Sequence, residues 1–144
     1  AEARRTQPAA RGSRPNPRMS PPPTAPDSPP PVLDEGALAR LRELDPEGRH
    51  GVVARVLSTY ENALARQLEQ MRAELDAPRG EVLGALAHTL KSSSASVGAL
   101  AFARACEALE QRIRQGATAQ THDVAELIRL GETALAAVRT ILRG

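Results

Sequence analysis

The chain has 144 residues with a formal net charge of +2, and its 19 basic residues are 18 arginines and one lysine, Lys91. The first 31 residues hold five arginines against two acids, whereas the other 113 hold 14 basic and 15 acidic residues. Nucleic-acid-binding domains concentrate basic and stacking aromatic side chains on a folded face. Residues 32–144 are nearly neutral and the whole chain has two aromatic residues, so the sequence argues against a nucleic-acid partner.

Residues 1–31 are predicted to be a disordered Pro/Arg-rich linker, because they contain ten of the 12 prolines and no Val, Ile, Leu, Phe or Tyr. The run PPPTAPDSPPP favours an extended polyproline spacer, and a ligand for an aromatic groove is the alternative interpretation. A start at Ala1 followed by such a segment suggests a piece of a longer chain. The segment has no apolar stretch of the kind found in signal peptides.

Residues 32–144 are predicted to form one all-helical domain. Asp34 is expected to cap a short helix that ends near Leu44, and a long helix is expected from about Gly51 to Leu75. Asp76 and Pro78 are expected to open a third helix, which ends at the turn Ser96-Val97-Gly98. Two more helices follow, and apolar residues recur at helical spacing in three of the segments: Val53, Leu57, Tyr60, Leu64, Leu68, Met71 and Leu75; then Phe102, Cys106, Leu109 and Ile113; then Val124, Leu127, Ile128, Leu135, Val138 and Leu142.

Charged residues of these helices alternate in sign at helical spacing. Glu69 with Arg72, and Glu110 with Arg114, are interpreted as ion pairs on a solvated face. The lone cysteine, Cys106, falls in an apolar stripe and is expected to be buried, and a single cysteine excludes an internal disulfide. His50 and His122 share no metal-ligand spacing with the third histidine, His88, so no metal site is predicted. No stretch is apolar enough to span a membrane, and a cytoplasmic location is expected.

One stretch, AHTLKSSSASVGAL, departs in composition from the Ala/Arg/Leu/Glu background. If it is helical, Leu83, Leu86 and Leu90 lie on one face and His88 points to solvent on the other. The residues expected around His88 are Glu81, Gly84, Ala85, Lys91, Ser92 and Ala95. An exposed neutral imidazole is a good nucleophile towards phosphorus, and Lys91 can neutralise a phosphoryl group on the ring. Taken alone, the pattern also fits ordinary solvated surface.

The segment HTLKSSSASVGA resembles the signature of histidine-containing phosphotransfer (HPt) domains, H-x-L-K-G-S/A-S/A followed by a spacer and G-A. The matching positions are His88, Leu90, Lys91, Ser93, Ser94, Gly98 and Ala99. Ser92 departs from the pattern, since many members have glycine there, and its hydroxyl is positioned to hydrogen-bond a phosphate or to crowd a partner. The resemblance extends from about Val32 to Leu142, including Tyr60 midway along the long helix and the segment ACEALE.

The resemblance implies an antiparallel four-helix bundle with an additional short N-terminal helix. It also implies that His88 accepts a phosphoryl group from the aspartate of one receiver domain and passes it to another, with Mg²⁺ bound by the receiver and no cofactor bound by this domain. Partner docking is expected around the histidine, at Gly84, Ala85, Ser92, Ala95 and Gly98. The family further suggests a monomeric domain at the C-terminus of a bacterial hybrid sensor histidine kinase, which tethers it to a membrane-bound sensor.

The sequence lacks the motifs expected of a kinase or a hydrolase. There is no glycine-rich phosphate loop, so ATP binding and kinase activity of its own are not expected. A hydrolase needs a partnered nucleophile in a pocket, which a convex helix face does not offer. The alternative that stays open is a catalytically inactive helical module that docks receiver domains or dimerises.

Overall fold

The computed structural model describes residues 31–144, and apart from Pro31 the predicted linker lies outside the described residues. The described part contains the helices α1 (Glu35–Glu43), α2 (Val52–Arg72), α3 (Gly80–Ser96), α4 (Leu100–Arg114) and α5 (Thr121–Arg143), and no strand occurs within it. The predicted all-helical fold is therefore confirmed.

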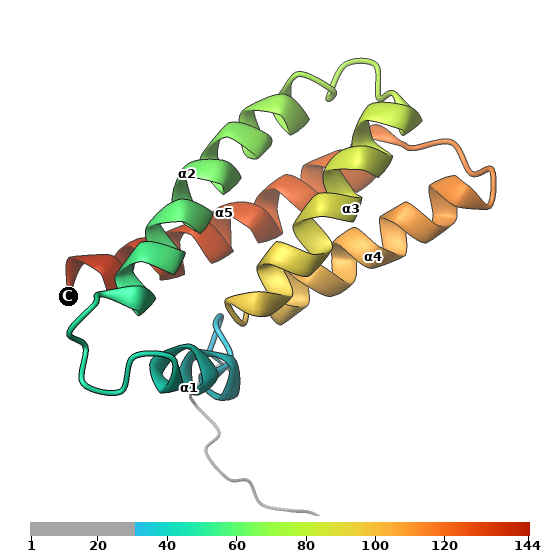
Figure 1. Cartoon of the computed structure of the whole chain (residues 1–144). Coiled ribbons are helices and arrows are strands. Elements are labelled where there is room, and N and C mark those ends of the chain that lie inside the picture. Colours follow the sequence, from blue (N-terminus) through green and yellow to red (C-terminus); the bar gives the residue numbers. More distant parts are fainter. Residues whose placement is uncertain (1–30) are drawn as a thin grey trace, which may run out of the picture. The chain divides into compact units, whose positions relative to one another are not determined.

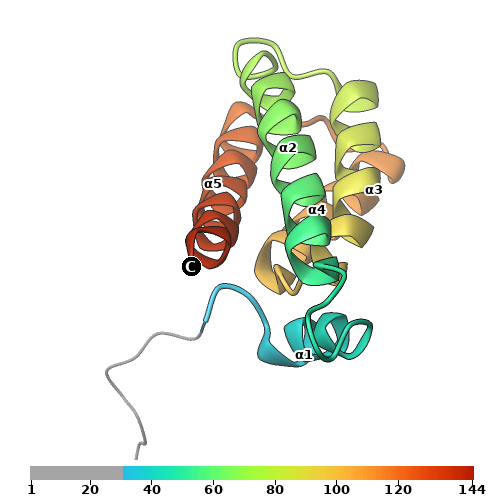
Figure 2. The ribbon, with the colours of Figure 1, turned by 60° about the vertical axis from the view of Figure 1, so that its left-hand side comes forward.

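The four long helices form an antiparallel bundle (Figure 1). α3 packs mainly against α4, and α2 packs mainly against α5. α5 also packs against α4, and α3 also packs against α2, so α3 and α5 occupy opposite corners. The short α1 lies across the end of the bundle where α3 turns into α4, as Figure 2 shows. This arrangement leaves one side of α3 facing outward.

The apolar stripes predicted from helical spacing supply the core of the bundle. α2 buries the middle of its stripe, and Val53 in its first turn is partly buried, as is Leu75, which lies beyond the end of the helix. α4 and α5 bury most of their stripes, while Ile113 and Leu142 pack at the margin. The buried members of the three stripes are Leu57, Tyr60, Leu64, Leu68, Met71, Phe102, Cys106, Leu109, Val124, Leu127, Ile128, Leu135 and Val138.

Gly131 allows α5 to lie close to its neighbours. A β-carbon at this position would come within 2.7 Å of Leu68 and 3.1 Å of the Phe102 ring. Real side chains do not tolerate the shorter contact, so a larger residue would require the Leu68 and Phe102 side chains or the helices themselves to shift. The glycine thus fits α5 against both α2 and α4.

The N-terminal helix is attached at the turn between α3 and α4. As predicted, the Asp34 side chain caps α1 by accepting a hydrogen bond from the Ala37 backbone N–H at 3.0 Å. The backbone N–H of Asp34 in turn donates to the carbonyl of Gly98 at 2.8 Å. Gly98 has a φ of 87°, and a β-carbon there would lie 2.7 Å from the Asp34 nitrogen. Only glycine meets both conditions, the positive φ and the close contact.

Two predicted helix boundaries are wrong. α2 ends at Arg72 rather than Leu75, and Asp76 does not cap α3, which begins at Gly80 after Arg79. The N-cap residue of α3 is Arg79, its side chain forms no cap hydrogen bond, and the buried carboxylate of Glu74 holds this residue instead. It accepts hydrogen bonds from the backbone N–H and the guanidinium of Arg79, and so ties the connection to the start of α3.

The described residues include no helix with the length and apolarity that crossing a bilayer requires.

Candidate functional site

α3 separates its residues into a buried and an exposed face, as the helical spacing predicts. Leu83, Leu86 and Leu90 are buried. The side chain of His88, on the opposite face, retains 62% of its accessible surface. The imidazole is therefore presented to solvent by a helix whose other face is fixed in the core.

The serines that follow His88 have different environments. Ser93 and Ser96 donate to carbonyls of the preceding turn. Ser94 is fully buried, and its hydroxyl lies 2.7 Å from the Tyr60 hydroxyl on α2. Burial raises the pKa of Tyr60 to about 12, so this pair stays neutral and joins α3 to α2. Ser92 is exposed beside His88.

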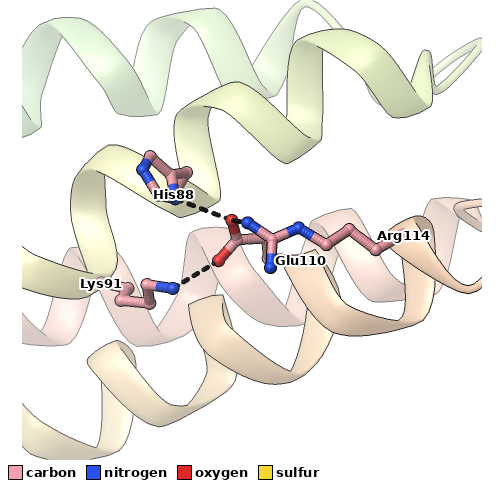
Figure 3. Close-up of polar contacts among 4 residues, drawn as sticks. All are labelled: His88, Lys91, Glu110 and Arg114. Atoms are coloured by element: carbon pink, nitrogen blue, oxygen red, sulfur yellow. Dashed lines mark hydrogen bonds and ion pairs between the residues drawn. The ribbon is translucent and has the colours of Figure 1, made fainter.

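Glu110 of α4 is the residue that organises the surroundings of His88 (Figure 3). Its Oε2 accepts a hydrogen bond from His88 Nδ1 at 2.7 Å, and its Oε1 accepts one from Lys91 Nζ at 2.8 Å. Arg114 Nη2 donates to the same Oε2 at 2.8 Å. The Glu110 carboxylate thus accepts hydrogen bonds from the imidazole and from two cationic side chains.

Glu110 and Arg114 were predicted to form an ion pair on a solvated face, and this prediction is wrong for Glu110, which is buried. Only 6% of the Glu110 side chain is exposed, whereas 64% of Arg114 is. The sequence held a signal that was missed: Glu110 directly follows Leu109 and lies four residues after Cys106, which places it beside the apolar stripe of α4. The pair of Glu69 with Arg72, in contrast, is an exposed contact at 3.0 Å, as predicted.

Glu110 is ionised at neutral pH. The hydrogen bond from Lys91 lowers the pKa of its carboxyl, and His88 and Arg114 lower it further, against the opposing effect of desolvation. An ionised carboxylate only accepts hydrogen bonds, so the proton in the contact with His88 belongs to Nδ1. In the neutral ring, Nε2 then carries the lone pair, and it is the nitrogen that Glu110 leaves available.

The expected docking residues do not all share one surface. Ala85, Ser92 and Ala95 are exposed on the outer side of α3. Gly84 is partly buried, because it faces Ile113 of α4, and Gly98 is buried beneath Asp34. The structure therefore gives Gly98 a role in the turn rather than a place on an accessible surface.

Grooves flank the outer side of α3. One, of about 470 Å³, lies between α2 and α3 and includes Ala85, Leu86 and Thr89 in its lining. Another, of about 310 Å³, lies between α3 and α4 and includes Lys91, Ser92 and Ala95. The exposed residues next to His88 thus form the edges of shallow depressions along the helix.

Other reactive groups of the described part do not form a second site. Cys106 is buried as predicted, and desolvation raises the pKa of its thiol to about 12, which keeps it in the unreactive thiol form. Within residues 31–144, no group of three or more His, Cys, Asp or Glu side chains could hold a metal ion.

Comparison with known proteins gives the family. The Hpt domain family model matches residues 55–140, which include α3 with His88 and Lys91, and Glu110 of α4. The chain belongs to the Hpt domain family. This membership places the Hpt domain in phosphoryl transfer within two-component signalling, where Hpt domains act with receiver domains of response regulators.

A solved structure resembles this Hpt domain along most of its length. The crystal structure of histidine-containing phosphotransfer protein B (HptB) from Pseudomonas aeruginosa PAO1 superposes with a TM-score of 0.63 and 28% sequence identity. The match covers 80% of this chain and 94% of HptB. A search of curated proteins found no match.

Proposed function

We propose that His88 is the phosphoryl-accepting residue of this Hpt domain and that Nε2 is the atom that reacts. The observation that carries the proposal is the contact between Glu110 and Nδ1, which holds the proton on the inner nitrogen of an exposed ring. A nucleophile needs a lone pair that faces its partner, and this contact supplies one.

The transfer needs no proton to leave the ring. The Nε2 lone pair attacks phosphorus of a receiver aspartyl phosphate, the N–P bond forms, and the P–O bond to the aspartate breaks with release of its carboxylate. The ring becomes a phosphorylated imidazolium that keeps its Nδ1 proton. Glu110 stabilises the positive charge that develops, because its carboxylate already accepts that N–H. Transfer of the phosphoryl group from His88 to the aspartate of a second receiver follows the same steps in reverse.

Lys91 and Ser92 complete the acceptor side of the reaction. Lys91 lies one turn after His88, and its ammonium, held near the ring by Glu110, provides a positive charge for the phosphoryl oxygens. Ser92 offers a hydroxyl on the same exposed face. Mg²⁺ belongs to the receiver in this proposal, where it neutralises the aspartyl phosphate, and the Hpt domain itself binds no cofactor.

His88→Gln is expected to abolish phosphoryl uptake and to change the free energy of unfolding by no more than about 0.5 kcal/mol, because the side chain is exposed. The measurement is transfer of radiolabelled phosphate from an aspartyl-phosphate receiver domain to the full chain, with acid lability as the mark of phosphohistidine. Label that reaches the variant as well as the native protein would contradict the proposal. No label on a natively folded chain from any tested receiver would favour the inactive docking module instead.

We propose that the receiver docks on the exposed side of α3 around Ala85, Ser92 and Ala95. Ala85→Arg is expected to slow receiver transfer about tenfold or more, because a long cation would separate the two surfaces around the reacting atoms. Ala125→Arg, an exposed alanine of α5 at the opposite corner of the bundle, is the matched control. Equal transfer rates for the two variants would remove this face from the interface.

A further inference from the structure

Arg114 is close to the reactive imidazole without an assigned function. It lies on α4 one turn after Glu110, and its Nη2 donates to the carboxylate oxygen that also accepts from His88 Nδ1. Because the imidazole and the guanidinium both bond to Glu110 Oε2, the two groups lie close together. Figure 3 shows the Glu110 carboxylate between them, with the His88 ring on one side and the Arg114 guanidinium on the other. The side chain is 64% exposed, so it can adjust to a group that arrives from solvent.

The charges of this cluster suit an incoming dianion. Among the groups that pair with Glu110, Lys91 and Arg114 contribute two positive charges against the one negative charge of the carboxylate, which leaves one positive charge in excess. A phosphoryl group carries about two negative charges, and the imidazolium that it forms offsets one of them. The excess positive charge offsets the other. Without Arg114, the phosphorylated ring, Lys91 and Glu110 would together carry one net negative charge. The other charged residues near this face occur with a partner of opposite sign: Arg104 and Glu107 line the groove beside Lys91, and Glu81 interacts with Arg79.

The chemistry of the guanidinium also fits. Arginine has five N–H donors in a planar fork, which matches phosphate oxygens, and a single donor nitrogen, Nη2, engages Glu110 here. The remaining N–H groups therefore suffice to contact a phosphoryl group while the contact with Glu110 persists. A carboxylate that restrains the side chain before transfer lowers the entropic cost of that contact.

We propose that Arg114 is a second phosphoryl-binding cation beside Lys91, and that Glu110 positions it. This inference rests on the proposed role of His88 as acceptor. The competing interpretation is a helix-stabilising pair between residues four positions apart, which would contribute nothing to the phosphorylated state.

The test is phosphorus NMR of the full chain after phosphorylation by phosphoramidate, a small donor that removes receiver docking from the measurement. A nearby cation favours the dianionic form, so Arg114→Gln is expected to raise the midpoint of the phosphoryl titration by about half a pH unit. Arg114→Lys should give an intermediate midpoint. Arg129→Gln is the matched control, since Arg129 is 63% exposed and pairs with Glu126 on α5.

A second readout uses the native sequence and so does not depend on how the variants fold. The side-chain N–H signal of Arg114 should shift on phosphorylation, whereas that of Arg129 should not. Phosphohistidine that forms normally, with the same midpoint in Arg114→Gln and native protein and no shift of the Arg114 signal, would overturn this inference and leave the acceptor role of His88 intact. Failure of the native protein to form phosphohistidine would overturn both.

Discussion

Replacing Glu110 with glutamine is expected to slow phosphoryl uptake by His88 on the order of 10- to 100-fold, the range by which carboxylates that orient functional imidazoles elsewhere contribute. Glutamine keeps the shape of the side chain but loses its charge. It can present its NH₂ group to the ring as readily as its oxygen, so Nδ1 is no longer the only nitrogen held as N–H. It also no longer stabilises the imidazolium that transfer produces.

The measurement is the single-turnover rate of transfer from a radiolabelled receiver domain, with folding of each variant checked by circular dichroism. Glu126→Gln provides the matched control, because Glu126 also pairs with an arginine but is exposed on α5. Because Glu110 is buried, lost activity alone would not separate positioning from misfolding. Proton–nitrogen correlation spectra of His88 make that separation, since a folded variant should show a mixture of the two ring tautomers. An unchanged rate in a folded variant would show that Glu110 has no part in transfer.

Leu90→Ala is expected to reduce the free energy of unfolding by about 2 to 5 kcal/mol, the second large effect. Leu90 is completely buried on the side of α3 opposite His88, and truncation would leave a cavity in the core. The loss should appear as a lower urea midpoint without a large change in the slope of the transition.

Leu44→Ala makes the same chemical change at a residue that is 67% exposed, and it should alter stability by no more than about 0.5 kcal/mol. Similar midpoints for the two variants would contradict the assignment of Leu90 to the core. They would also weaken the argument that α3 is fixed with His88 pointing outward.

The fold was largely predictable because apolar residues at helical spacing report directly on burial. Leu57, Leu64 and Leu68 identify the buried face of α2, and the structure buries all three. Helix ends were harder to predict. Asp76 has the chemistry of an N-cap, but the buried carboxylate of Glu74 holds the backbone N–H of Arg79 instead, a contact whose partners local sequence preferences do not identify.

The candidate site was predictable on one helix and not across two. The exposure of His88 and its proximity to Lys91 follow from residue spacing within α3. The contact with Glu110 joins residues 22 positions apart, so it depends on how α3 packs against α4. The pair with Arg114 was visible as an i, i+4 spacing, but that spacing does not reveal that Glu110 turns towards α3 while Arg114 stays in solvent.

The most direct test of this account is proton–nitrogen correlation NMR of the His88 ring before and after phosphorylation, with His88→Gln used to assign its signals among the three histidines. We expect a neutral ring protonated at Nδ1 that becomes phosphorylated at Nε2. A ring protonated at Nε2, or a phosphoryl group bonded to Nδ1, would contradict the role assigned to Glu110 and the direction from which the receiver approaches.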